Sequence, residues 1–268
     1  MKTKTVWLCS ICFGLFLFSC NLEKTIEVEI PKQEKGLVVE AYLEKGKPLK
    51  VLLMETDPYF DSLRLPLLAN ADIRLETSGV SDSLLPKVSL DIQNRKLYNF
   101  ESTYVPDGSE GVFNLKVAES GRLLFGSCRF LPEPVLDTIE VQYNPADSMA
   151  RFLFWIKDFS GESNFYRVLA NQDSLSGSNV LDFTFTDNGF DGKIFPLITG
   201  YRFEKGKKII VRLFHIEQQY YQYLRAISAA DRSNGNPFAQ PSTIRSPMEG
   251  NGYGIFTSLN YRTIILQP

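Results

Sequence analysis

The chain of 268 residues has little of the chemistry on which most metal and nucleophile sites depend, with one histidine and four cysteines. A zinc centre built on histidines needs more than one of them, so that class of site is excluded. His215 closes an apolar run and no Gly-x-Ser-x-Gly elbow accompanies it, so we expect a hydrogen-bonded structural residue. The sequence therefore predicts no catalytic residue, no metal ligand and no cofactor.

No apolar run is long enough for a membrane-spanning helix. Residues 6–18 form the signal-like run, preceded by two lysines, and a span needs about 20 apolar residues. The run closes with Leu17-Phe18-Ser19-Cys20, which resembles a lipobox. We predict a signal peptide over residues 1–19 and acylation of Cys20, which then anchors the mature chain to a membrane. An ordinary secretory signal that happens to contain cysteines is the alternative.

The mature chain is also predicted to contain no intramolecular disulfide. Cleavage removes Cys9 and Cys12, and acylation occupies Cys20, so Cys128 stands alone in the mature chain. An intramolecular disulfide is then impossible even in an oxidising compartment. Cys128 lies in a strand-like run, which favours a buried structural thiol over a nucleophile.

The chain also lacks an excess of positive charge, since 29 Lys and Arg residues stand against 31 Asp and Glu residues. Loss of Lys2 and Lys4 with the signal peptide leaves 27 basic against 31 acidic residues, a net charge of −4. No arginine-rich run or basic patch is present, so nucleic acid is not expected as a partner.

Alternation of apolar and polar residues with a period of two dominates the chain from residue 36. Leu37, Val39, Ala41 and Leu43 alternate with other residues, and Val88, Leu90 and Ile92 repeat the pattern in a later segment. The pattern is typical of half-buried strands. We predict a mainly β protein whose residues 36–131 form an immunoglobulin-like antiparallel sandwich. The charge-rich residues 20–35 are interpreted as a lipidated tether.

Two prolines in Leu131-Pro132-Glu133-Pro134 mark the best internal boundary, because proline does not continue a central strand. Residues 135–268 are predicted to form a second antiparallel β-sheet domain carrying one α-helix near residues 217–233. Tyr220, Leu224 and Ile227 give that helix its apolar stripe, which we expect to cover one face of the sheet. A last pair of strands is expected between Ile255 and Leu266. Independent domains and one continuous sandwich both fit this pattern.

Three groups of residues could carry function, each with a simpler structural interpretation. Asp187-Asn188-Gly189-Phe190-Asp191-Gly192 could bind calcium, but a turn whose carboxylates accept backbone N–H groups is favoured. Glycine repeats in residues 250–256 suit a structural corner or a binding edge, and the corner is favoured. Four further carboxylates could supply a pair for glycoside hydrolysis, namely Glu40, Glu55, Asp57 and Asp61. The sequence does not determine the distances between them. The many aromatic residues are expected mainly in cores.

The order of several motifs resembles a functionally unassigned family of outer-membrane lipoproteins from Bacteroidota, a domain-of-unknown-function family. The motifs that carry the resemblance are the Cys20 lipobox, Leu37-Val38-Val39-Glu40-Ala41-Tyr42-Leu43, Asp57-Pro58-Tyr59-Phe60, Ala69-Asn70-Ala71-Asp72-Ile73, Phe185-Thr186-Asp187, Phe190-Asp191-Gly192, Asn236-Pro237-Phe238-Ala239 and Gly250-Asn251-Gly252-Tyr253-Gly254-Ile255-Phe256. In the last motif, Ser246-Pro247-Met248-Glu249 stands where the family carries an Asn-Ile pair. The resemblance therefore transfers no role to an asparagine of that loop.

The resemblance implies a context and assigns no catalytic residue. Members of the family are encoded beside TonB-dependent transporters, so the expected partners are a membrane, through the lipid anchor, and such a transporter. The expected place is the outer membrane, on its periplasmic or its cell-surface face. We expect a non-enzymatic accessory or binding subunit in nutrient uptake, with its ligand unknown. A surface hydrolase of glycans or peptides and a structural or adhesive module are the alternatives.

Overall fold

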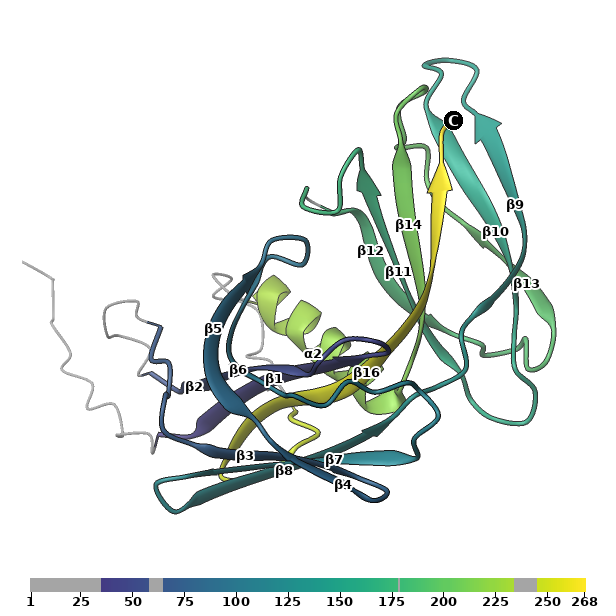
Figure 1. Ribbon diagram of the computed structural model, residues 1–268. Coiled ribbons are helices and arrows are strands. Elements are labelled where there is room, and N and C mark those ends of the chain that lie inside the picture. Colours follow the sequence, from purple (N-terminus) through teal and green to yellow (C-terminus); the bar gives the residue numbers. More distant parts are fainter. Residues whose placement is uncertain (1–34, 58–64, 178, 234–244) are drawn as a thin grey trace, which may run out of the picture. The chain divides into compact units, whose positions relative to one another are not determined.

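Strands dominate the part of the chain that the computed structural model describes, which is residues 35–57, 65–177, 179–233 and 245–268 (Figure 1). The predicted signal peptide (1–19), Cys20, Asp61 and nearly all of the tether over 20–35 lie outside these residues. No helix in the described part is long and apolar enough to cross a membrane.

The described strands and the helix follow the predicted class. The strands are β1 (Leu37–Glu44), β2 (Lys50–Glu55), β3 (Asp72–Thr77), β4 (Val80–Ser83), β5 (Leu85–Asp91), β6 (Lys96–Glu101), β7 (Val112–Glu119), β8 (Arg122–Arg129), β9 (Val135–Tyr143), β10 (Ala150–Lys157), β11 (Phe165–Gln172), β12 (Asn179–Thr186), β13 (Ile194–Ile198), β14 (Ile209–Ile216), β15 (Glu249–Gly250) and β16 (Gly252–Leu266). The helix is α2 (Gln218–Ser233). A mainly β fold with several antiparallel sheets and a helix is thus confirmed.

Three sheets organise these strands. The largest has the order β12-β11-β14-β16-β1-β2-β6-β5, the second β15-β8-β7-β3-β4 and the third β13-β10-β9. Neighbouring strands are antiparallel except for β1 and β16, which are parallel. The expectation of a strand pair near the C-terminus is wrong. One long strand, β16, fills that segment, because its first half pairs with β1 and its second half with β14.

The largest sheet shares a different core with each of the smaller sheets. At the β1 and β2 end, Leu37 and Val39 pack in one cluster with Phe113 of β7. At the β11 and β14 end, Tyr166 and Leu213 pack with residues of β10 and β13. The connection at Leu131-Pro132-Glu133-Pro134 separates β8 from β9, while β16 contributes to both clusters. Strand pairing therefore joins the two regions that the prolines divide in sequence.

Helix α2 packs on the opposite face of the largest sheet. Tyr220 and Tyr223 are buried against a cluster that includes Phe214 and Ile216 of β14. Leu224 and Ile227 pack at its margin. The stripe read from the sequence is thus the packed face of the helix. Strand β14 is buried along its whole length, because it has the three-stranded sheet on one face and the α2 cluster on the other.

The glycine-rich segment carries the chain from one sheet to another. β15 pairs with β8 and β16 pairs with β1, so the crossing occurs at Asn251. The Asn251 N–H donates to the Leu123 carbonyl at 2.7 Å, and its carbonyl accepts from the Leu37 N–H at 3.0 Å. A Cβ at Gly254 would lie 1.9 Å from the Val39 carbonyl oxygen, so only glycine allows this approach. This geometry is that of a structural corner.

One strand presents its apolar side chains differently from the expected pattern. Val88, Leu90 and Ile92 are 70%, 66% and 69% exposed, although their alternation predicts a buried face. β5 is the last strand of the largest sheet, and the shared core includes Phe100 of its neighbour β6 but no residue of β5. Alternation marks one apolar face of a strand, whereas burial requires a second layer over that face.

Candidate functional site

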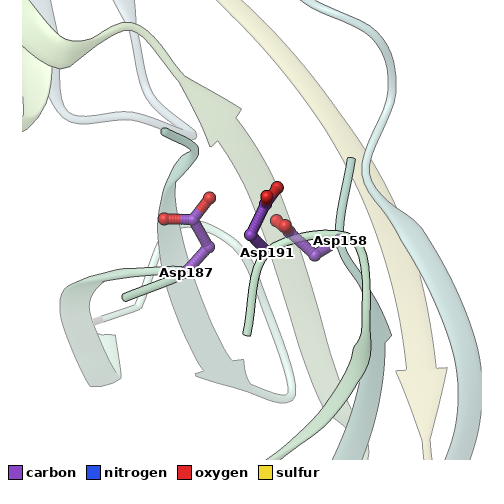
Figure 2. A group of neighbouring side chains, drawn as sticks. All are labelled: Asp158, Asp187 and Asp191. Atoms are coloured by element: carbon purple, nitrogen blue, oxygen red, sulfur yellow. The ribbon is translucent and has the colours of Figure 1, made fainter. Parts of the chain in front are cut away.

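Three carboxylates from two connections meet at one end of β10, β12 and β13. Asp158 follows β10 and Asp187 follows β12, while Asp191 lies in the turn before β13 (Figure 2). One oxygen from each lies within 4.8 Å of the others. The Asp187–Gly192 motif therefore supplies two of the three carboxylates, and Asp158 joins them only through the fold.

Hydrogen bonds explain this arrangement. Asp158 accepts the Tyr166 hydroxyl at 2.7 Å through Oδ1 and the Gly192 N–H at 2.9 Å through Oδ2. Asp187 accepts the Asn164 N–H at 2.8 Å, and Asp191 accepts the Gly161 N–H at 2.8 Å. Backbone N–H groups in irregular loops have no partner from a regular strand or helix, so they need such acceptors. The carboxylates thus organise turns, and three of them fall short of the six to eight oxygens that Ca²⁺ prefers.

His215 lies next to this cluster with an oxygen acceptor beside each ring nitrogen. Nδ1 is 3.0 Å from the Pro132 carbonyl oxygen and Nε2 is 2.9 Å from Oδ1 of Asn164. The ring stacks between Phe159 and Tyr166, with centroids 5.1 and 5.2 Å away. Burial lowers the pKa of His215, while the bond to Pro132 and nearby carboxylates oppose this effect. The residue connects the β8–β9 link to the Asn164 loop, as a structural histidine would.

A cleft of about 830 Å³ opens beside His215 and is here called the histidine cleft. Glu162 and Glu217 line it from different segments. Glu217 accepts the Arg129 N–H through Oε1 at 3.2 Å and the Thr257 hydroxyl through Oε2 at 3.1 Å. Burial raises the pKa of Glu217 against these hydrogen bonds. Neither glutamate lies in a motif, so sequence patterns offered no signal for this pair.

Of the other carboxylates named from the sequence, the structure describes Glu40, Glu55 and Asp57. Glu40 on β1 forms an ion pair with Lys96, and Glu55 on β2 forms ion pairs with Lys35 and Arg122. Asp57 is exposed, and Asp61 lies outside the described residues. Separate basic partners thus engage Glu40 and Glu55, which leaves the acidic groups dispersed.

Cys128 is buried on β8, as its apolar surroundings predict. Burial, and then the nearby Glu217 carboxylate, raise the pKa of its thiol well above the ordinary value. A thiol in this setting is protonated at neutral pH, so it is a poor nucleophile.

The edge of the largest sheet is a second candidate site, of a different kind. The β5 edge consists of Leu85, Val88, Leu90 and Ile92, which are all more than half exposed. Pro86 and a register shift between Pro86 and Ser89 interrupt the pairing of β5 with β6. Proline and bulges hinder the addition of a whole strand to an edge. The β5 edge therefore suits packing of side chains against a partner better than extension of the sheet.

These observations define a mainly β, sandwich-like protein whose described residues form a polar cleft and an exposed apolar edge. Residues 23–265 match the family model described as Domain of unknown function (DUF4249), so the chain belongs to that family. No curated protein matches the chain.

Proposed function

We propose that the chain is an outer-membrane lipoprotein, anchored through Cys20, that serves as a non-enzymatic accessory or binding subunit of a TonB-dependent nutrient transporter. The β5 edge is the observation that carries this proposal, because exposed apolar groups gathered on one strand are typical of protein interaction sites. The lipobox-like run ending at Cys20 supports membrane attachment, and the family resemblance supports a transporter as partner.

The non-enzymatic role is supported by the way the candidate groups are used. His215 is buried between two rings with an oxygen acceptor beside each nitrogen, and Glu217 accepts hydrogen bonds from Arg129 and Thr257. A general base needs a free lone pair directed at the substrate. These groups instead hold neighbouring segments together.

Co-purification tests the proposal directly. The full-length lipoprotein is expressed in its native outer membrane, extracted in mild detergent and captured, and a transporter barrel should elute with it. The double variant V88E/L90E should lose the barrel. Burying one Val or Leu side chain contributes roughly 1.5–3 kcal/mol, so losing two weakens binding by at least about 100-fold.

A matched control is available on another edge strand. Ile194 and Ile198 on β13 are 47% and 53% exposed, and β13 is the end strand of the three-stranded sheet. The double variant I194E/I198E should retain the barrel. Absence of a barrel with the unaltered protein, or equal recovery with V88E/L90E, would count decisively against the proposal.

A surface hydrolase is the second candidate, because Glu162 and Glu217 line one cleft in different environments. Glu162 is exposed, whereas burial raises the pKa of Glu217, which suits Glu217 as the acid of such a pair. Hydrolysis of a polysaccharide or peptide that both E162Q and E217Q abolish, with folding intact, would favour this candidate. The structural or adhesive module predicts self-assembly without any transporter.

A further inference from the structure

A small cavity of about 180 Å³ lies on the α2 face of the largest sheet. Its floor comes from four neighbouring strands, with Arg167 on β11, Arg212 on β14, Tyr261 on β16 and Tyr42 on β1. The turn between β5 and β6 also lines it, and Oδ1 of Asn94 in that turn accepts a hydrogen bond from Nη1 of Arg212 at 3.1 Å. We call this space the aromatic cavity.

Arg212 is the unusual residue of this cavity. It is only 8% exposed, and alternation along β14 places it on the same face as Phe214. Its Nε is buried and has no hydrogen-bond partner, and Arg212 forms no ion pair with a carboxylate of the described residues. A buried cation without a counter-charge costs several kcal/mol, so such cations are normally paired.

Apart from the exposed Arg95 of the β5–β6 turn, the neighbouring basic side chains are compensated. Nη2 of Arg167 lies 2.8 Å from Asp182, in an ion pair whose other bond comes from Nε. Lys96 is paired with Glu40, and Lys47 lies 2.6 Å from Glu44. Burial lowers the pKa of Arg212, Tyr261 opposes this effect, and the nearby Arg167 cation adds to it, while the Glu44 and Asp91 carboxylates also raise the pKa. Among the described residues, the cavity thus holds one buried cation, Arg212, with which no carboxylate lies within ion-pair distance.

The walls indicate what kind of anion fits. Tyr42, Tyr98, Phe214 and Tyr261 present aromatic rings to the cavity. Burial raises the pKa of Tyr42, Tyr98 and Tyr261, so these side chains remain neutral at physiological pH. Ligand pockets usually measure about 300–1,000 Å³, so this smaller space suits a small molecule or the end of a longer one.

We infer that the aromatic cavity binds a small organic carboxylate, whose carboxylate pairs with the guanidinium of Arg212 and whose apolar body packs on the aromatic rings. A guanidinium matches a planar carboxylate through two parallel hydrogen bonds. Arg212 is the buried unpaired cation of the described lining, and one such cation balances a monoanion better than a phosphate dianion. The carboxylate belongs either to a free organic acid or to the C-terminus of a peptide.

This inference names a ligand class for the proposed binding subunit and rests on that proposal for the fate of the ligand. Binding itself is measurable without a transporter. Full-length mature lipoprotein in mild detergent is titrated with benzoate by calorimetry at low salt. A Kd on the order of 1 mM or tighter is expected for a ligand of this size, and neutral benzamide should not bind.

Two variants and a control separate the charge from the cavity. R212M should weaken benzoate binding at least about 30-fold, since it removes the charge while keeping an apolar side chain of similar length. Leu259 also lines the cavity, so L259W should block binding by filling the space while Arg212 stays intact. Arg262 is exposed on the same strand as Leu259, and R262M should bind like the unaltered protein.

Peptides that end in phenylalanine, with a free or an amidated C-terminus, identify the source of the carboxylate. Stronger binding of the free-ended peptide than of benzoate assigns a peptide end, and the reverse assigns a free acid. No benzoate or peptide binding, equal benzoate binding by R212M, or preference for inorganic phosphate overturns the inference. V88E/L90E should leave benzoate binding unchanged, and R212M should leave transporter recovery unchanged, so each proposal can fail separately.

Discussion

Replacing Gly254 with alanine should destabilise both halves of the largest sheet. An added Cβ would lie 1.9 Å from the Val39 carbonyl oxygen and 2.9 Å from the Val39 nitrogen, and both are backbone atoms that cannot rotate away. Gly254 also has a backbone φ of 146°, which residues with a side chain rarely adopt. Overpacking costs about 1–3 kcal/mol and backbone strain about 1–3 kcal/mol. The expected loss is therefore about 2–6 kcal/mol, a large part of a typical stability.

Urea unfolding of the mature chain measures this loss with two signals. Once the signal peptide is removed, Trp155 on β10 is the only tryptophan, and it reports on the region around the three-stranded sheet. Circular dichroism reports on all strands. Because β16 pairs with both β1 and β14, both signals should shift to lower urea in G254A.

A second glycine provides the control. Gly206 also has a positive φ, 82°, but nothing lies within 4 Å of the place its Cβ would take. G206A should therefore cost only the backbone strain. If G254A is no less stable than G206A, the close approach of β16 to β1 does not add an overpacking cost to the loss of stability.

Two further predictions concern His215 and Cys20. The pKa of His215 is lowered on folding, so the unfolded chain takes up a proton first as pH falls below about 7. The stability contributed by neutral His215 is thus present above the ordinary pKa and declines as pH falls towards the folded-state pKa. Urea midpoints measured from about pH 8 to pH 5 should fall less steeply for H215Q, and equal slopes would contradict this reasoning. Metabolic labelling with palmitate should disappear in C20A and persist in C128A, and labelled C20A would place the anchor elsewhere.

Local patterns predicted most of the secondary structure. The alternation in Leu37, Val39, Ala41 and Leu43 corresponds to a strand with one buried face, and Tyr220 and Leu224 lie on the packed side of a helix. These patterns work because side chains alternate along a strand and recur every three to four residues along a helix. The same reasoning failed at Val88 and Leu90, where the strand formed but no second layer covers it.

The candidate sites could be predicted from the sequence less well than the secondary structure. Asp187 and Asp191 were visible as a turn motif, but Asp158 joins them from another connection. The segment Ile209–Ile216 contained a visible signal in Arg212, a lone cation inside an apolar strand. Its meaning depends on which carboxylates lie nearby, and those are distributed over β1, β12 and the segments around them.

The single histidine, the signal-like start ending at Cys20, the balance of charge and the period-two alternation follow from the sequence alone, because composition and local spacing determine them. The tertiary structure decided that β16 serves two regions, that the β5 edge is exposed and that Arg212 has no counter-charge among the described residues. These features depend on contacts between segments that are distant in the chain, such as Leu37 with Gly252 and Ile209 with Leu266. The physical reason is that burial and charge pairing belong to the assembled layers, whereas periodicity belongs to each segment by itself.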